Sequence, residues 1–236
     1  MELNITENIK RQEQTTIEDL NLPSSTYDAI KAGRDINPDQ SALIYIPDGN
    51  IYNLTVHFSY DDFLSIVTQA ANLFSSLGLG NEDVISMLLP NLPEAYFTIW
   101  GGEAVGIVNP INPMLEEKVL EDILLKAKSK LLVTSLPSSN NYIWPKIESI
   151  LDNLPDLETI IFVNSDYSKR SLDYSLPEDL SKKVIDWHQS VSLQPKHLNF
   201  EIRAFEGNEI ASIFHTGGTT GRPKLAQHTH KNIVSD

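Results

Sequence analysis

The chain has 236 residues, of which 41% are hydrophobic, and its formal net charge is −14. It is therefore long enough for one large domain or two small ones with a real core, and its charge argues against nucleic acid or an anionic membrane surface as the main partner. The absence of cysteine excludes disulfides, thiolate zinc sites and a cysteine nucleophile.

The first twenty residues are polar and lack the apolar segment of a signal peptide. No apolar run in the chain approaches the length of a membrane span. We therefore expect a cytoplasmic protein with no membrane span. We also expect residues 1–40 to form an irregular lead-in with one short helix over 25–32.

The first regular elements are a strand over 41–46, a PDGN turn and a returning strand over 54–58. A helix follows, because Ser59 and Asp62 have the spacing of a capping box and apolar residues then recur with helical spacing up to Gly78.

From residue 84 to residue 164, short apolar runs alternate with helical patterns. Such runs are typical of strands that are buried on both faces. We predict strands over 84–90, 106–112, 130–135 and 157–164, and helices over 93–105, 115–128 and 141–152. This alternation predicts an α/β fold with a mostly parallel sheet and helices on both faces.

The remaining sequence is less regular. We predict loops around one helix in the proline-containing segment 165–200, a strand over 209–215, a further strand over 225–230 and a helix that Lys231 opens. We divide the chain into the lead-in 1–40, an α/β parallel-sheet subdomain over 41–208, and a segment 209–236 with a glycine-rich loop and the start of the next subdomain. If the sheet is incomplete at the end of this sequence, its last strand leaves an apolar edge exposed. We therefore also expect self-association.

The segment HTGGTTGRPK, residues 215–224, has the composition of a loop that binds phosphate. Its glycines are Gly217, Gly218 and Gly221. Glycine accepts a positive φ and has no side chain, so backbone N–H groups can converge on an anion. A flexible surface loop of glycine and threonine is the alternative interpretation.

Threonine hydroxyls and one lysine complete the loop. Thr216, Thr219 and Thr220 can bond phosphate oxygens or support a metal, and Lys224 adds a positive charge. Residues 201–236 carry equal numbers of basic and acidic side chains, so the net negative charge lies in residues 1–200. The loop is not a Walker A motif, because Arg222 follows Gly221 where that motif has Lys-Ser/Thr.

Two histidines follow the loop. On the predicted strand 225–230, His228 and His230 would share a face. No third ligand lies nearby in the sequence, so we predict packing and hydrogen bonding for this pair and no metal site.

The segment IFHTGGTTGRPK resembles the signature loop TSGTTGxPKG of the adenylate-forming enzymes. This AMP-binding superfamily includes acyl-CoA synthetases, luciferases and peptide-synthetase adenylation domains. Gly217 stands where serine is common, and Leu225 stands where glycine is common. Residues 58–115 are similar to the N-terminal half of the family, with a strand that ends in LPN and a later NP turn. The resemblance covers about residues 40 to 236.

The resemblance implies two half-reactions. A carboxylate attacks the α-phosphate of Mg-ATP to give acyl-AMP and pyrophosphate, and the thiol of CoA then displaces AMP. It implies ATP, Mg²⁺ and CoA as cofactors and substrates, and a small-molecule carboxylate, of fatty-acid type, as the acid. The loop residues 216–221 and Lys224 would hold the β- and γ-phosphates. No catalytic residue is assigned.

The chains of the family are considerably longer. In them the adenine and ribose contacts, the acidic magnesium ligand, the hinge and the catalytic lysine follow the region that matches here. We therefore expect an N-terminal fragment of an acid–CoA ligase, inactive alone, whose partner is the missing C-terminal portion. Two alternatives stay open: a short, non-catalytic relative that acts as a nucleotide-binding or interaction module, or part of a fatty-acyl adenylate ligase.

Overall fold

The computed structural model describes residues 21–47, 55–137, 142–165, 174–178, 180–200, 207–217 and 223–235. The described helices are α2 (Thr26–Ile36), α3 (Tyr60–Ser76), α4 (Pro93–Glu103), α5 (Glu117–Ala127), α6 (Trp144–Ile150), α7 (Trp187–Ser192) and α8 (His230–Ser235), and the 3₁₀ turn η2 (Leu151–Asn153). The strands are β1 (Ser41–Tyr45), β2 (Val56–Ser59), β3 (Val84–Leu88), β4 (Ile107–Pro110), β5 (Ser129–Ser135), β6 (Thr159–Val163), β7 (Lys183–Asp186), β8 (Ile210–Thr216) and β9 (Lys224–Thr229).

A seven-stranded sheet in the order β7-β6-β5-β3-β4-β8-β9 forms the centre of the described structure. All neighbouring pairs from β7 to β8 are parallel, and β9 alone pairs antiparallel, with β8. β1 and β2 form a separate antiparallel hairpin. The prediction of an α/β fold with a mostly parallel sheet is therefore confirmed.

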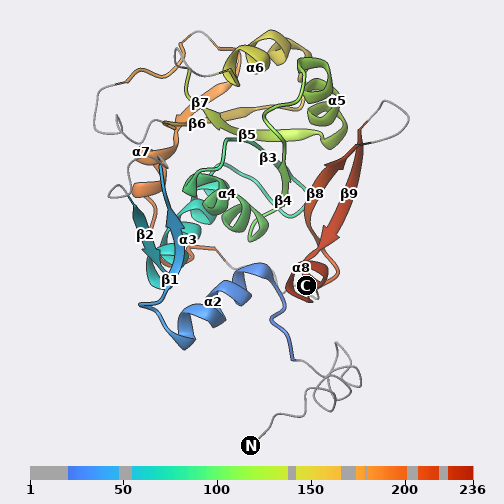
Figure 1. The fold of residues 1–236 in the computed structure, drawn as a ribbon. Helices are drawn as coiled ribbons and strands as arrows, with labels where there is room; N and C mark the ends of the chain where they lie inside the picture. The colour runs from blue at the N-terminus through green and yellow to red at the C-terminus, as the bar shows by residue number, and fades with distance from the viewer. Residues whose placement is uncertain are drawn as a thin grey trace, which may run out of the picture.

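Helices cover both faces of this sheet (Figure 1). On one face, α3, α4 and α7 pack over a cluster that includes Phe74, Ile85 and Ile161. On the other face, α5 and α6 pack over Leu132 and Phe162. Each of these five side chains is fully buried, as expected for strands enclosed between two helical layers.

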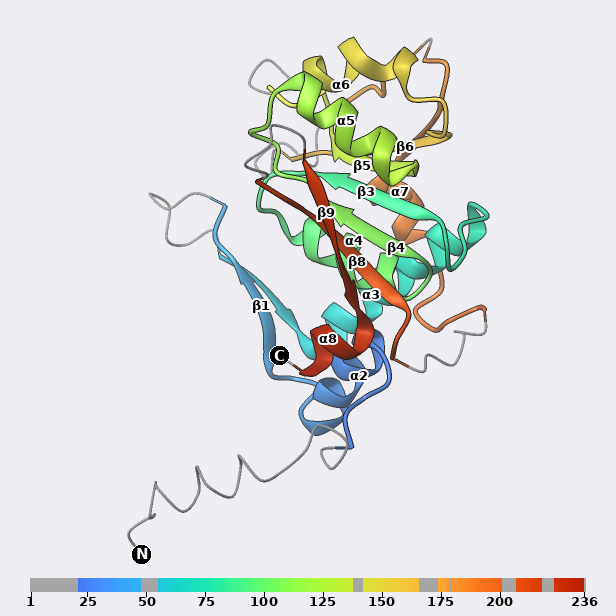
Figure 2. The same cartoon turned by 90° about the vertical axis from the view of Figure 1, so that its right-hand side faces the viewer.

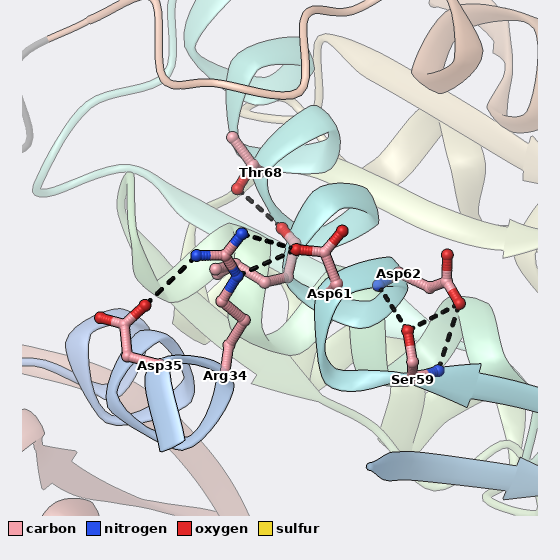
Figure 3. Close-up of polar contacts among 7 residues, drawn as sticks. Arg34, Asp35, Ser59, Asp61, Asp62 and Thr68 are labelled. Carbon is pink, nitrogen blue, oxygen red and sulfur yellow. Dashed lines mark hydrogen bonds and ion pairs between the residues drawn. The ribbon is translucent and has the colours of Figure 1, made fainter. Parts of the chain in front are cut away.

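The start of α3 shows how the sequence sets a local structure (Figure 3). The Asp62 N–H donates to Ser59 Oγ at 3.1 Å, and the Ser59 N–H donates to Asp62 Oδ2 at 3.3 Å. This reciprocal pair satisfies two N–H groups that the helix leaves without partners. The predicted capping box is confirmed.

Two further predictions need correction. Residues 183–186 form strand β7, although we predicted loops around one helix in the segment 165–200; among the described residues of that segment, the one helix is α7. Near the N-terminus, α2 runs to Ile36, beyond the predicted end at residue 32. Half of the lead-in, residues 1–20, lies outside the described residues. Among the described helices, none is both long and apolar enough to cross a membrane.

Candidate phosphate-binding site

The glycine-rich loop connects the two strands of the β8–β9 hairpin. Thr216 and Lys224 are direct cross-strand partners in this hairpin, so their side chains leave the same face of the sheet. The structure describes Gly217 and Pro223 inside the loop, whereas residues 218–222 lie outside the described part. Gly218, Thr219, Thr220 and Gly221 are therefore not placed by the structure.

The hairpin is buried at its base and exposed at its tip. Ala211 and Ser212 of β8 are completely buried, whereas Lys224 is exposed. Because β8 runs parallel to β4, its last residue, Thr216, lies at the carboxyl ends of the parallel strands. Ligands of open α/β sheets bind at this edge. A Cβ atom added to Gly217 would meet no atom of the described residues within 4 Å, so they leave the backbone there open to a ligand.

Two contacts hold the end of the loop against the rest of the fold. Lys126 of α5 donates from Nζ to the Pro223 carbonyl oxygen at 3.3 Å. Leu225, the next residue but one, packs against the hydrophobic cluster below α5. The exit of the loop is thus fixed from the α5 side, and Lys126 adds a second positive charge beside Lys224. Sequence spacing gave no indication of Lys126, since it comes from a distant helix.

A buried polar cluster fixes the base of the hairpin. Ser212 of β8 forms a hydrogen bond with the Glu103 carboxyl group of α4, and Glu103 is 1% exposed. Burial raises the pKa of Glu103 to about 7, and hydrogen bonds to Ser212 and Thr26 partly oppose this rise. The sequence offered one signal for this group, since Glu103 is a lone carboxylate in the apolar stretch that precedes β4.

His230 joins the same cluster. Its Nδ1 accepts a hydrogen bond from the Thr26 N–H at 3.3 Å, so this nitrogen carries no proton. Burial lowers the pKa of His230 to about 4, while the charges of Glu209 and Asp28 act in the opposite direction. The imidazole therefore serves as an N-terminal partner for α2. Figure 2 shows α2 and α8 side by side at this end of the molecule.

The prediction that His228 and His230 share a strand face was wrong. β9 ends at Thr229, and His230 is the first residue of α8. The reason is a second capping box: the Asn232 N–H donates to Thr229 Oγ1 at 3.2 Å, and the Thr229 N–H donates to Asn232 Oδ1 at 3.1 Å. His228 remains on β9 and packs edge-on against Phe214, with ring centroids 5.2 Å apart.

Comparison with curated proteins gives relatives that are CoA ligases. The chain is 35% identical over 193 residues to a marinolic acid–CoA ligase of Pseudoalteromonas sp. (strain SANK 73390), a match that covers 82% of this chain and 27% of that one. It is 29% identical to a crotonobetaine/carnitine–CoA ligase of Escherichia coli O1:K1, covering 84% and 35% of the two chains. It is 25% identical to a long-chain-fatty-acid–CoA ligase of Bacillus subtilis, covering 92% and 39%.

The chain thus spans about a third of the length of the curated relatives it matches. Among solved structures, it resembles an anthranilate CoA ligase in complex with anthranoyl-AMP, with a TM-score of 0.74 and 22% identity over 92% of this chain and 36% of that chain. This likeness supports the fold. The family model described as AMP-binding enzyme matches residues 33–236, and the chain therefore belongs to the AMP-binding, adenylate-forming enzyme family.

Proposed function

We propose that the chain is the N-terminal part of an ATP-dependent acid–CoA ligase and that its glycine-rich loop binds the β- and γ-phosphates of ATP. The reaction of the whole enzyme would join a carboxylate to the α-phosphate of ATP with release of pyrophosphate. The thiol of CoA would then attack the acyl carbon and release AMP. Support comes from the family and from the relatives, which are CoA ligases.

The observation that carries this proposal is the pairing of Thr216 with Lys224 across the mouth of the loop. It brings a hydroxyl group and an ammonium group to the same face, next to the open backbone of Gly217. Such a site positions phosphates and neutralises their charge, and it needs no covalent chemistry of its own. We assign phosphate contacts to the loop residues Thr216, Gly217, Gly218, Thr219, Thr220, Gly221 and Lys224.

The substrate of the whole enzyme is a separate proposal. The matched relatives are named for different acids, among them long-chain fatty acids. We propose a carboxylic acid of fatty-acid type, with Mg²⁺ entering as the metal of Mg-ATP. When bound, Mg²⁺ would neutralise phosphate charge, and the threonine hydroxyls of the loop are the groups on this chain that would support it. A cytoplasmic location and the division of the chain at residues 40 and 208 also stay predictions.

We further propose that residues 1–236 alone do not adenylate a carboxylate, because the matched relatives extend far beyond the matching region. Purified chain should give no ATP–pyrophosphate exchange with any carboxylate. An exchange signal that the Lys224→Met substitution abolishes would contradict this proposal. The intact mass of the protein in its own cells provides a second measurement. A mass of 26.5 kDa would favour the alternative of a short nucleotide-binding relative, and a much larger mass would support the ligase.

ATP binding tests the loop itself. We expect Lys224→Met to weaken the affinity for Mg-ATP about tenfold, because an ammonium near the phosphates contributes roughly 1.4 kcal/mol. Isothermal titration calorimetry of the 236-residue chain would measure it. Lys118→Met is the matched control, since Lys118 is an exposed lysine that pairs with Glu121 and Asp122 on α5. Equal affinities of the two variants would overturn the assignment of Lys224.

A further inference from the structure

A hollow lies away from the glycine-rich loop, between α2, the first turns of α3 and the segment 196–198. It encloses about 290 Å³, near the lower limit for small-molecule pockets. Figure 1 places α2 at the opposite end of β8 from Thr216. Three of its ten lining residues are lysine or arginine, although the whole chain has only 18 such residues among 236 and a net charge of −14. Asp61 is the one carboxylate among the ten, so three cations and one anion give the lining a net charge of +2 in an acidic protein.

Arg34 forms a fixed wall of this hollow (Figure 3). Its Nε and Nη2 donate to Asp61 Oδ1 at 2.9 and 2.8 Å, and its Nη1 donates to Asp35 Oδ1 at 3.3 Å. These carboxylates neutralise the guanidinium group. Arg34 therefore helps to form the wall of the hollow but adds little net positive charge to it. The charge that is available to a ligand must come from the other two cations.

Those two cations are Lys31 on α2 and Lys196 on the opposite side. Both are exposed, and neither forms an ion pair with another residue in the described part of the chain. Asp28 lies one turn before Lys31, but its Oδ2 already accepts hydrogen bonds from the hydroxyls of Ser24 and Ser25 at 3.1 and 2.8 Å. Both ammonium groups are therefore unpaired in the described part of the chain, and Asp61, the carboxylate that lines the hollow, is bonded to Arg34.

The segment that carries Lys196 is held in place by a buried side chain. Asn72 of α3 is completely buried. Its Nδ2 donates to the carbonyl oxygens of Pro195 and His197 at 2.9 and 2.8 Å, and its Oδ1 accepts from the Asn199 N–H at 3.1 Å. These bonds satisfy one amide completely and fix the backbone on both sides of Lys196. The second cation is thus presented by a pre-organised segment, which lowers the cost of binding a ligand.

The floor of the hollow supplies one uncommitted hydroxyl group. Thr68 donates to the Leu64 carbonyl oxygen at 2.7 Å, and Tyr27 forms a 2.7 Å hydrogen bond with Thr68 Oγ1. Both of these hydroxyls are engaged within the protein. Ser65 also lines the hollow, and its hydroxyl has no hydrogen-bond partner among the described residues. Ser65 lines the hollow together with Lys31 and Lys196, and its hydroxyl can donate to an anion.

We propose that this hollow is a binding site for a small phosphate-bearing molecule, held by Lys31 and Lys196 with Ser65 as a hydrogen-bond donor. Two flexible ammonium groups with a hydroxyl suit a phosphate group, which accepts hydrogen bonds from several directions. Leu64 and Leu198 line the same hollow and provide an apolar surface for the organic part of the ligand. The site does not depend on the function of the glycine-rich loop.

The experiment is a titration of the isotope-labelled chain with inorganic phosphate at constant ionic strength, followed by two-dimensional amide NMR. We expect saturable shifts at Lys31, Ser65 and Lys196. In the double variant K31Q/K196Q, the dissociation constant read from Ser65 should rise about tenfold, because each unit charge about 5 Å from an anion in water contributes a factor of several. K118Q, at an exposed lysine of α5, is the control and should leave the dissociation constant unchanged.

Two outcomes would overturn the proposal. One is the absence of saturable shifts at these three positions in the unmodified chain. The other is an unchanged dissociation constant at Ser65 in the double variant, since the lysines would then not hold the anion. Gly217 provides an internal reference: phosphate binding at the glycine-rich loop would shift its amide whether or not the double variant binds at Ser65. The two sites are therefore read separately in one titration.

Discussion

The central strands and the β8–β9 hairpin belong to one sheet but differ in burial. Every residue of β3 and of β6 is buried, whereas no residue of β9 is fully buried and β8 becomes exposed towards Thr216. The centre of the sheet therefore contributes most to stability through packing. The hairpin leaves hydroxyl and ammonium groups free to meet a ligand, and it is held at its base by the polar contacts of Ser212 and His230.

The largest expected effect comes from two phenylalanines, one in each region. Phe162 of β6 is completely buried and lies 4.8 Å, between ring centroids, from Trp144. Phe214 of β8 is 38% exposed. We expect Phe162→Ala to lower the free energy of unfolding by about 4 kcal/mol, because it removes buried area and leaves a cavity. Phe214→Ala should cost about 1 kcal/mol or less, since its side chain is partly hydrated.

Urea denaturation of both variants, followed by circular dichroism, measures this difference. Similar losses for Phe162→Ala and Phe214→Ala would show that the hairpin is as important to stability as the central strands. That result would contradict the distinction between central strands that stabilise the fold and a hairpin that binds the ligand.

The next effect concerns the base of the hairpin and depends on pH. The pKa of Glu103 is about 7 in the folded protein against 4.5 as the ordinary value. The folded state therefore holds the proton of Glu103 more tightly than the unfolded state does. The resulting stabilisation of the folded state is complete below pH 4.5 and is lost as pH rises through 7. Between pH 4.5 and about pH 8 this group should lower the free energy of unfolding by about 3 kcal/mol.

Glu103→Gln removes the titration and keeps an oxygen that can accept from Ser212. We expect the variant to gain stability relative to the unmodified chain as pH rises, with the difference measured by urea denaturation at about pH 5 and about pH 8. Glu148→Gln, at an exposed carboxylate of α6, is a control for the general effect of removing one negative charge. A pH dependence that Glu103→Gln leaves unchanged would assign the slope to other groups.

The sequence predicted those elements whose causes lie within a few residues. The capping box of Ser59 and Asp62, and the apolar run that forms β3, are both local signals, and both predictions are confirmed. β7 was missed because its four residues are only partly apolar and become a strand by pairing with β6. The partner strand β6 ends at Val163, whereas β7 begins at Lys183. The pairing is therefore not a local feature, and no short sequence pattern within β7 indicates it.

For the candidate site, the sequence predicted the loop and its two flanking strands but not their supports. Glycines and threonines in a row indicate phosphate chemistry by composition. By contrast, the contact between Glu103 and Ser212 joins residues of α4 and β8 that lie far apart in the sequence. Periodic sequence patterns do not predict contacts between such distant residues. The placement of His230 on the strand was wrong because Asn232, two residues later, caps the helix that the histidine begins, whereas its predicted hydrogen bonding is confirmed by the bond with Thr26.

The smallest expected effect concerns Lys126, which links the two regions by reaching from α5 to the loop. Its hydrogen bond to the Pro223 carbonyl oxygen is 3.3 Å long and exposed, so its contribution to stability is roughly 0.5 kcal/mol or less. We expect Lys126→Met to leave the free energy of unfolding unchanged within error and to weaken Mg-ATP binding about twofold, because the exit of the loop loses one support and the site loses one nearby charge. Calorimetric titration beside Lys118→Met, on the same helix, measures this effect. A loss as large as that of Lys224→Met would instead make Lys126 a direct phosphate ligand. An unchanged affinity would show that Leu225 alone suffices to hold the exit of the loop.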